Sequence, residues 1–316
     1  MANAFTDATA LTLYIEKALD AQAKYDLHAR PIFRPLIDFR PGVLTNPGQP
    51  VKLTIDPYIA VQKTTLPESS DPDTVAMGAP TVVTVSPLEK GMSTVTTIRL
   101  TDLAYTDIPK RRAHIVGANM IDSVDDLIKD VYDTSTNLTT KEGGTIKFTG
   151  NSLVAITASD KLDGDMVATT SARLRGRLAE PKVGEDYIAV AHPHVTRDLM
   201  REAITSGSWL YIHANGGDLM PVYNGEVGKL AGVRFVESTK VNKAAVGASG
   251  ASVYTTYFLG REAVVEHVVT EPRIVVGNIG RDSFGRFFNV GWYGHLGWSL
   301  YRPEPLELVK TSANIQ

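Results

Sequence analysis

The chain has 316 residues and no cysteine, which excludes disulfide bonds, thiol catalysis and metal centres with cysteine ligands. It has no apolar run near the roughly 18 residues of a membrane span and no basic-then-apolar signal pattern, so we expect a soluble protein made in the cytoplasm. The formal net charge is only −3, which argues against a dedicated nucleic-acid-binding protein. The sequence does have 43% hydrophobic and 21% charged residues, the balance of a globular protein with a sizeable core.

The familiar catalytic motifs are also missing. No GxGxxG stretch stands between a predicted strand and a helix, and no GxxxxGK[ST] loop or GxSxG elbow is present. The one pair with metal-ligand spacing is His192 and His194, whose side chains point the same way if they end a strand. A metal-dependent hydrolase that uses these two histidines is therefore the alternative function, although metal sites need three or four positioned ligands.

The most informative stretch runs from Pro181 to Thr239. The apolar run 187–191 predicts a buried strand, which Pro193 ends because proline has no N–H to donate to a neighbouring strand. Apolar residues at helical spacing then predict a helix of roughly ten to twelve residues. Glycines bracket two further short strands between 225 and 238. The pattern indicates a small α/β unit.

The same stretch resembles a known family. A strand that ends in "AHP", a helix that contains Asp198-Leu199, and then "GEVGKLAGVRFVEST" are similar to the major capsid proteins of tailed bacteriophages, in the branch of the podovirus N-four coat protein. The resemblance implies an α+β chain with the Hong Kong-type capsid fold. It divides the chain into an N-terminal arm (1–50), an extended β-loop (51–106), a peripheral domain with a long spine helix (107–180), an axial domain (181–261) and C-terminal β segments that return to the peripheral domain (262–316).

The first hundred residues are predicted to need a partner surface. Leu11 and Ile15 belong to one thin apolar face of a short helix, and residues 30–50 carry five prolines, which favour an extended strap. Alternating apolar residues predict strands within 51–101, with a polar tip that begins at Leu66-Pro67. Two or three thin strands are barely stable alone, and the resemblance implies that they lie across a neighbouring copy.

Residues 107–133 give the clearest helix, with apolar residues at three- and four-residue spacing and Pro109 in the first turn. Three acidic residues, Asp122, Asp125 and Asp126, are expected on its solvated face. Lys110, Arg111 and Arg112 oppose the helix dipole at its N-terminus. They are either solvated or in contact with another subunit's carboxylates or with DNA phosphates.

A second helix is predicted over 160–178. Its inner face should consist of Leu162, Met166, Thr170, Leu174 and Leu178, with Arg173, Arg175 and Arg177 mostly facing outward. Residues 240–252 are small and predict a mobile surface loop. The segment 287–300 should form β-structure on the long helix, and 301–309 resembles the terminal strand of the peripheral domain.

We expect a structural protein without catalysis or cofactor. Copies would form rings of five and six that join into an icosahedral shell around DNA, in the virion, after synthesis in the host bacterial cytoplasm. Expected partners are other copies, portal and scaffolding or decoration proteins, and DNA in non-specific contact. A lysine–asparagine crosslink between Lys63 and Asn278 or Asn289 is possible in principle but not expected. A β-rich binding module is a further alternative.

Overall fold

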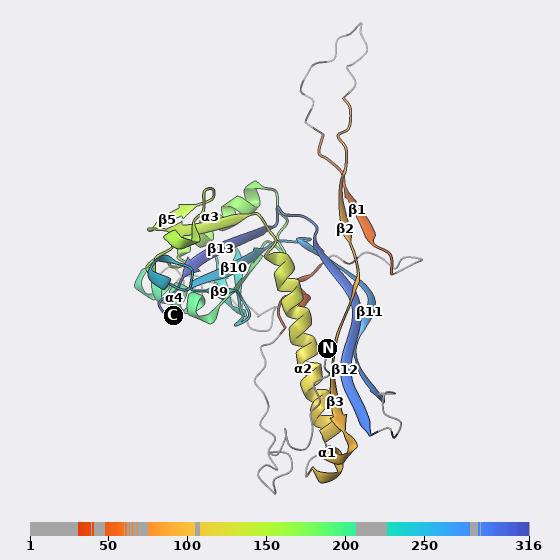
Figure 1. The fold of residues 1–316 in the computed structure, drawn as a ribbon. Helices are drawn as coiled ribbons and strands as arrows, with labels where there is room; N and C mark the ends of the chain where they lie inside the picture. Colours follow the sequence, from red (N-terminus) through yellow and green to blue (C-terminus); the bar gives the residue numbers. More distant parts are fainter. Residues whose placement is uncertain are drawn as a thin grey trace.

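The structure is a computed structural model. It describes residues 31–38, 40, 48–59, 75–104, 108–206, 226–278 and 286–315, together with 61, 63, 65, 68 and 284. A compact lobe lies on one side of a long helix, a second and smaller sheet lies along the helix on the other side, and a thin ribbon extends away from both (Figure 1).

The helices and short helical turns are as follows: η2 (Arg34–Leu36), α1 (Ile98–Leu103), α2 (Ile108–Tyr132), η3 (Leu153–Ala155), α3 (Gly164–Gly176), α4 (Pro193–Ser206) and η4 (Ala248–Gly250). The strands are β1 (Val51–Ile55), β2 (Thr81–Val85), β3 (Leu88–Thr97), β4 (Leu138–Glu142), β5 (Thr145–Lys147), β6 (Tyr187–Ala191), β7 (Glu226–Leu230), β8 (Val233–Glu237), β9 (Lys243–Ala244), β10 (Val253–Leu259), β11 (Val264–Asn278), β12 (Phe287–Leu300) and β13 (Leu306–Ser312). None of these helices combines the length and the apolar composition that a membrane span requires.

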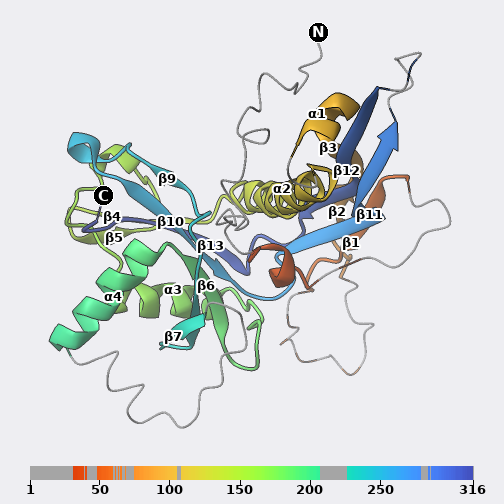
Figure 2. The same ribbon diagram turned by 90° about the horizontal axis from the view of Figure 1, so that it is seen from below.

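The strands form three separate sheets. The large sheet has the order β5-β4-β13-β10-β6-β8-β7, and β9 pairs with β10. The small sheet has the order β11-β12-β3, and β1 pairs only with β2 in an antiparallel ribbon. Figure 2 shows the large sheet in the lobe and the small sheet beside α2.

The large sheet is buried on both faces. Tyr187, Ala189 and Ala191 of β6 face the core beneath α3 and α4, whereas Ile188 and Val190 face a second core. Alternate side chains of a strand point to opposite faces, so a strand covered on both sides is apolar throughout. This is why the apolar run 187–191 predicted a buried strand correctly.

Helix α2 connects the two sheets. Its C-terminal half places Val124, Ile128 and Tyr132 in the second core of the large sheet. Its N-terminal half packs Val116 against Val290 and Trp292 of β12 in the small sheet. The helix has 25 residues and spans about 37 Å, so one rigid element sets the distance and angle between the two parts.

The structure confirms several sequence-based predictions: the long helix at 108–132, the helix after Ala191, the helix within 160–178, and β-structure at 287–300 on the long helix. The division into peripheral and axial domains stays a prediction.

The terminal strand predicted within 301–309 is β13, which lies in the large sheet between β10 and β4, and its assignment to the peripheral domain stays a prediction. Two predictions about local placement are wrong. Strand β3, assigned to the extended loop, pairs with β12 over ten residues of the small sheet. Residues 240–252 include β9, which pairs with β10. A partner strand far away in the sequence determines the position of β3, and local composition carries no signal for such pairing, whereas β9 forms a local pair with the next strand, β10.

Two arginine assignments also need correction. Arg177 lies 2.6 Å and Arg173 3.5 Å from the carboxylate of Glu307, whose side chain has no solvent exposure. They are drawn inward because a buried carboxylate needs opposite charge and hydrogen-bond donors.

Candidate functional site

The ribbon β1–β2 continues into an extension that exposes several large apolar side chains. The paired part runs from Val51↔Val85 to Ile55↔Thr81, and the chain continues beyond it on both sides (Figure 1). Tyr58 is 83% exposed, and Val75 and Met77 are similarly exposed. A two-stranded ribbon is marginal alone, and contiguous exposed apolar side chains mark an interaction surface. The ribbon therefore has the character of a segment completed by another molecule.

The base of the ribbon is fixed to the small sheet. Val51 and Val85 are buried, and the chain crosses β12 at Ser86. A side chain at Gly297 of β12 would place its Cβ 2.4 Å from the carbonyl oxygen of Ser86, so only glycine allows this close approach. The root of the ribbon is thus rigid, while its far part projects from the subunit.

The N-terminal strap, residues 31–38, folds onto its own subunit. Ile32, Phe33 and Leu36 are buried in the core between α2 and the large sheet. Asp125 of α2 accepts backbone N–H bonds from Ile32 (3.1 Å), Phe33 (2.8 Å) and Arg34 (3.1 Å). The expectation that the whole region 1–105 is completed only by another copy is therefore wrong for the strap.

Asp125 was expected on the solvated face of the helix, and this too is wrong, because its side chain is fully buried. Burial raises the pKa of Asp125, against the lowering effect of the three backbone N–H bonds and of Lys240. Lys240 lies 3.9 Å from Asp125 and 2.7 Å from Asp122. One carboxylate therefore joins the strap to the long helix.

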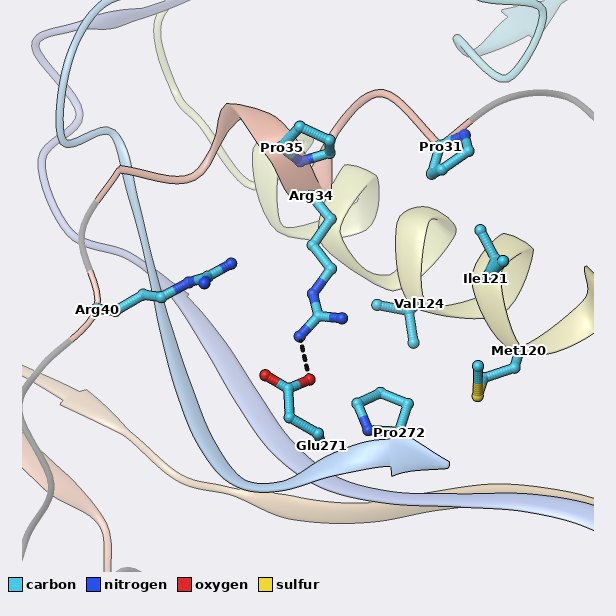
Figure 3. Close-up of a pocket in the computed structure, with 9 residues that line it drawn as sticks. All are labelled: Pro31, Arg34, Pro35, Arg40, Met120, Ile121, Val124, Glu271 and Pro272. Carbon is cyan, nitrogen blue, oxygen red and sulfur yellow. Dashed lines mark hydrogen bonds and ion pairs between the residues drawn. The ribbon is translucent and has the colours of Figure 1, made fainter. Parts of the chain in front are cut away.

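A groove of about 400 Å³ lies where the strap, α2 and β11 meet (Figure 3). Arg34 crosses it from the strap, 2.7 Å from Glu271 and 3.0 Å from the buried Glu266. Arg40 lies 2.9 Å from the second oxygen of Glu266. Burial lowers the pKa of Arg34, but Glu271 and Glu266 outweigh it and raise that pKa overall. The groove is thus spanned by ion pairs that attach the strap to the small sheet.

The two histidines of the alternative function lie close together, with ring centroids 4.4 Å apart. His192 Nδ1 accepts the backbone N–H of His194 at 3.1 Å, so that nitrogen holds the start of α4. His194 Nδ1 lies 3.0 Å from the Tyr254 hydroxyl and from the Ile315 carbonyl oxygen. Within the part of the chain that the structure describes, no group of three or more His, Asp or Glu side chains could hold a metal. The pair packs between α4, β10 and the C-terminal residues.

Four of the predicted contact residues, Leu11, Ile15, Leu66 and Pro67, lie outside the described residues. Lys110, Arg111 and Arg112 occupy the first turns of α2, where Lys110 is exposed and the two arginines are half-buried. All three have interactions within their own subunit. Their contacts with another copy stay a prediction.

The candidate crosslinking residues are described in part. Asn289 lies within β12 and donates a hydrogen bond to Ser93 of the neighbouring strand at 3.3 Å. Lys63 is exposed in the segment beyond the ribbon, and Asn278 ends β11. The fold assigns Asn289 a role inside its own sheet.

Comparison with known proteins gives matches at the level of structure alone. No family model and no curated protein matches the sequence. The capsid of Ralstonia phage GP4 matches with a TM-score of 0.69 and 14% identity, over 94% of this chain and 95% of that one. The head of Helicobacter pylori bacteriophage KHP40 matches with a TM-score of 0.68 and 13% identity, over all of both chains. The SrpI encapsulin complex of Synechococcus elongatus matches with a TM-score of 0.56 and 13% identity, over 99% and 98% of the two chains.

The chain therefore has the Hong Kong-type α+β fold of phage capsids over almost its whole length, as its sequence resemblance predicted. The N-four-like branch stays a prediction.

Proposed function

We propose that this protein is the major coat subunit of a tailed bacteriophage, and that copies of it assemble into the icosahedral shell that encloses the genome. The observation that carries the proposal is the projecting ribbon with its exposed Tyr58, Val75 and Met77, on a fold that the chain shares with phage capsids. A subunit that acted alone would gain nothing from holding these side chains in water.

Head-to-tail contacts follow from the shape of the subunit. The ribbon projects from one place on the molecule and must lie on a different surface of the next copy, which is a heterologous contact. Such contacts close into rings of five or six when the rotation between copies allows it. Each contact can be modest, because many equivalent contacts hold each subunit in place once the shell closes.

The finer assignments belong to the same proposal. Portal and scaffolding or decoration proteins would be further partners, and packaged DNA would be contacted without sequence preference. The net charge of −3 fits such loose contact, since a strongly basic lining would hold DNA tightly. The protein would reside in the virion capsid after synthesis in the host bacterial cytoplasm, and its role would be structural, without catalysis or a bound cofactor.

Electron microscopy of the protein expressed alone tests the proposal. Rings, sheets or closed shells are expected, and compact monomers at high concentration would contradict it. Phage capsids and heads account for the matches with TM-scores of 0.65 to 0.69, whereas the encapsulin match has a TM-score of 0.56, so we favour the phage coat over a protein compartment. Metal analysis of the same preparation tests the hydrolase alternative, because stoichiometric zinc or iron would support a site at His192 and His194.

A further inference from the structure

Helix α3 ends in a turn that normally needs glycine. The N–H of Ala179 bonds to the carbonyl of Leu174, and the N–H of Leu178 to that of Arg175, both at 3.0 Å. This is the Schellman pattern, in which the residue at position 178 takes the left-handed conformation. Leu178 has a φ of 59°, and Leu174 and Ala179 make the apolar contact that accompanies the motif. The turn is complete without any side chain at position 178.

The leucine side chain finds no place in its own subunit. Leu178 was expected on the inner face of its helix, and this is wrong, because it is 90% exposed, whereas Leu162, Met166, Thr170 and Leu174 are buried as expected. The left-handed turn swings the side chain away from the core. A leucine here carries both backbone strain and full exposure to water, and glycine would avoid both. Neither folding nor packing of the isolated subunit accounts for it.

Leu178 projects beside two grooves with a mixed apolar and charged lining. It stands between two grooves that it helps to line, one of about 540 Å³ towards Tyr301 and Pro305 and one of about 440 Å³ towards Pro181. The same patch carries exposed charges of both signs, since Arg261 lies 3.9 Å from Glu180. In a two-fold contact the same patch of both copies meets itself. A patch that holds a projecting side chain, a groove and charges of both signs suits such a contact, because each of these features can meet its opposite on the other copy.

We propose that Leu178 is the centre of a two-fold contact between copies of this chain. In this contact each Leu178 enters the groove of the other copy, and Arg261 of one copy faces Glu180 of the other. The inference rests on the proposed shell, because a closed shell needs contacts between rings as well as within them. It assigns that second contact to the patch at the end of α3.

A cysteine at this position provides a direct test, because the natural chain has none. L178C should form disulfide-linked dimers on mild oxidation, since a self-contact brings the two thiols within reach of each other. Val154 is 69% exposed and lines neither groove, so V154C is the matched control and should stay monomeric on a denaturing gel. If the two thiols lie somewhat too far apart to form a disulfide, a short bismaleimide crosslinker should link them instead.

The outcomes separate this inference from the proposed function. Shells of L178C that yield no linked dimer with either reagent would overturn the two-fold contact and leave the coat role intact. If L178C forms no shells, the same assay on the concentrated protein decides, since dimers there support the contact and their absence overturns it. Absence of shells from the unaltered chain counts against the coat role alone.

L178G separates assembly from folding. Glycine removes the strain, so the melting temperature should stay the same or rise, while the concentration at which shells form should increase about tenfold or more. Ser249 also has a positive φ, of 54°, and lines neither groove. S249G is therefore the matched control, which should relieve backbone strain in the same way and leave the concentration for shell formation unchanged. Shell formation by L178G at the concentration of the unaltered chain would overturn the proposal.

Discussion

Asp125 shows how much of the fold can depend on one side chain. Its two oxygens accept three backbone N–H groups of the strap, 91 to 93 positions away in sequence. Buried backbone donors that lose their acceptor must stay unbonded in the core or draw the strap into water. The strap therefore depends on this carboxylate more than on its own composition.

We expect D125A to lower the free energy of unfolding by about 3 kcal/mol, because two buried donors and one partly buried donor lose their partner. D125N keeps one acceptor oxygen, so its free energy of unfolding should fall less than that of D125A. Asp126 is the matched control: it lies on the same helix, is half exposed and pairs with Lys129 at 3.6 Å, so D126A should change stability by less than about 0.5 kcal/mol. Urea denaturation measures all three, and equal losses for D125A and D126A would refute the anchor.

His192 makes the start of α4 sensitive to acid. Burial, His194 and Lys243 lower the pKa of His192 from 6.5 to about 4. Between pH 6.5 and about 4 the unfolded chain binds a proton at this site that the folded chain does not, so stability falls as the pH drops through this window and levels off below it. A protonated imidazole also cannot accept the N–H of His194.

H192N should resist this loss, since asparagine caps a helix without titrating. Between pH 7 and pH 4.5 we expect the parent to lose about 1 kcal/mol more than H192N, a figure reduced for solvent screening. H192A separates the two effects: it should be less stable than the parent at pH 7, yet its loss in acid should resemble that of H192N. Identical pH profiles for parent and H192N in thermal unfolding would contradict the prediction.

At the scale of elements, local patterns predicted what local physics determines. The apolar spacing of residues 108–132 and the proline in the first turn define α2 almost to the residue. The run Tyr187–Ala191 followed by Pro193 defines β6 and the start of α4. In these segments the periodicity, the chain breaks and the tertiary environment all agree.

Elements whose position depends on a distant partner were not predictable in this way. Glu307 stands between two leucines in β13, an alternation that suggests solvent exposure, yet it is buried because Arg173 and Arg177 meet it from α3. The prediction that Leu178 faces the core is wrong for a related reason. Helical spacing extends to Leu178, but the left-handed turn at that residue redirects its side chain.

The ribbon is the element whose removal should separate folding from assembly. Deletion of residues 62–80 should leave a folded subunit, because the described residues outside this segment form all three cores. The deleted subunit should not assemble, because the projecting part is lost. Melting temperature and electron microscopy measure the two effects, and loss of folding would show that the segment belongs to the subunit's own core.

At the scale of the whole molecule, both sheets combine early and late parts of the chain. In the small sheet, Thr94 of β3 donates to the carbonyl of Val290 in β12, 196 positions further on. In the large sheet, β4 pairs with β13, where Thr139 and Glu307 are bonded across 168 positions. The large and the small sheet are therefore each held together by contacts between distant segments of the chain.

On the proposed coat role, this arrangement bears on when a newly made copy can join others. The ribbon is synthesised early, whereas β12, against which its root packs, and β13, which links β4 to β10, are made much later. We therefore expect a chain that is still being synthesised to lack the sheet that orients its ribbon, so that contacts between copies form only after β13 has been made.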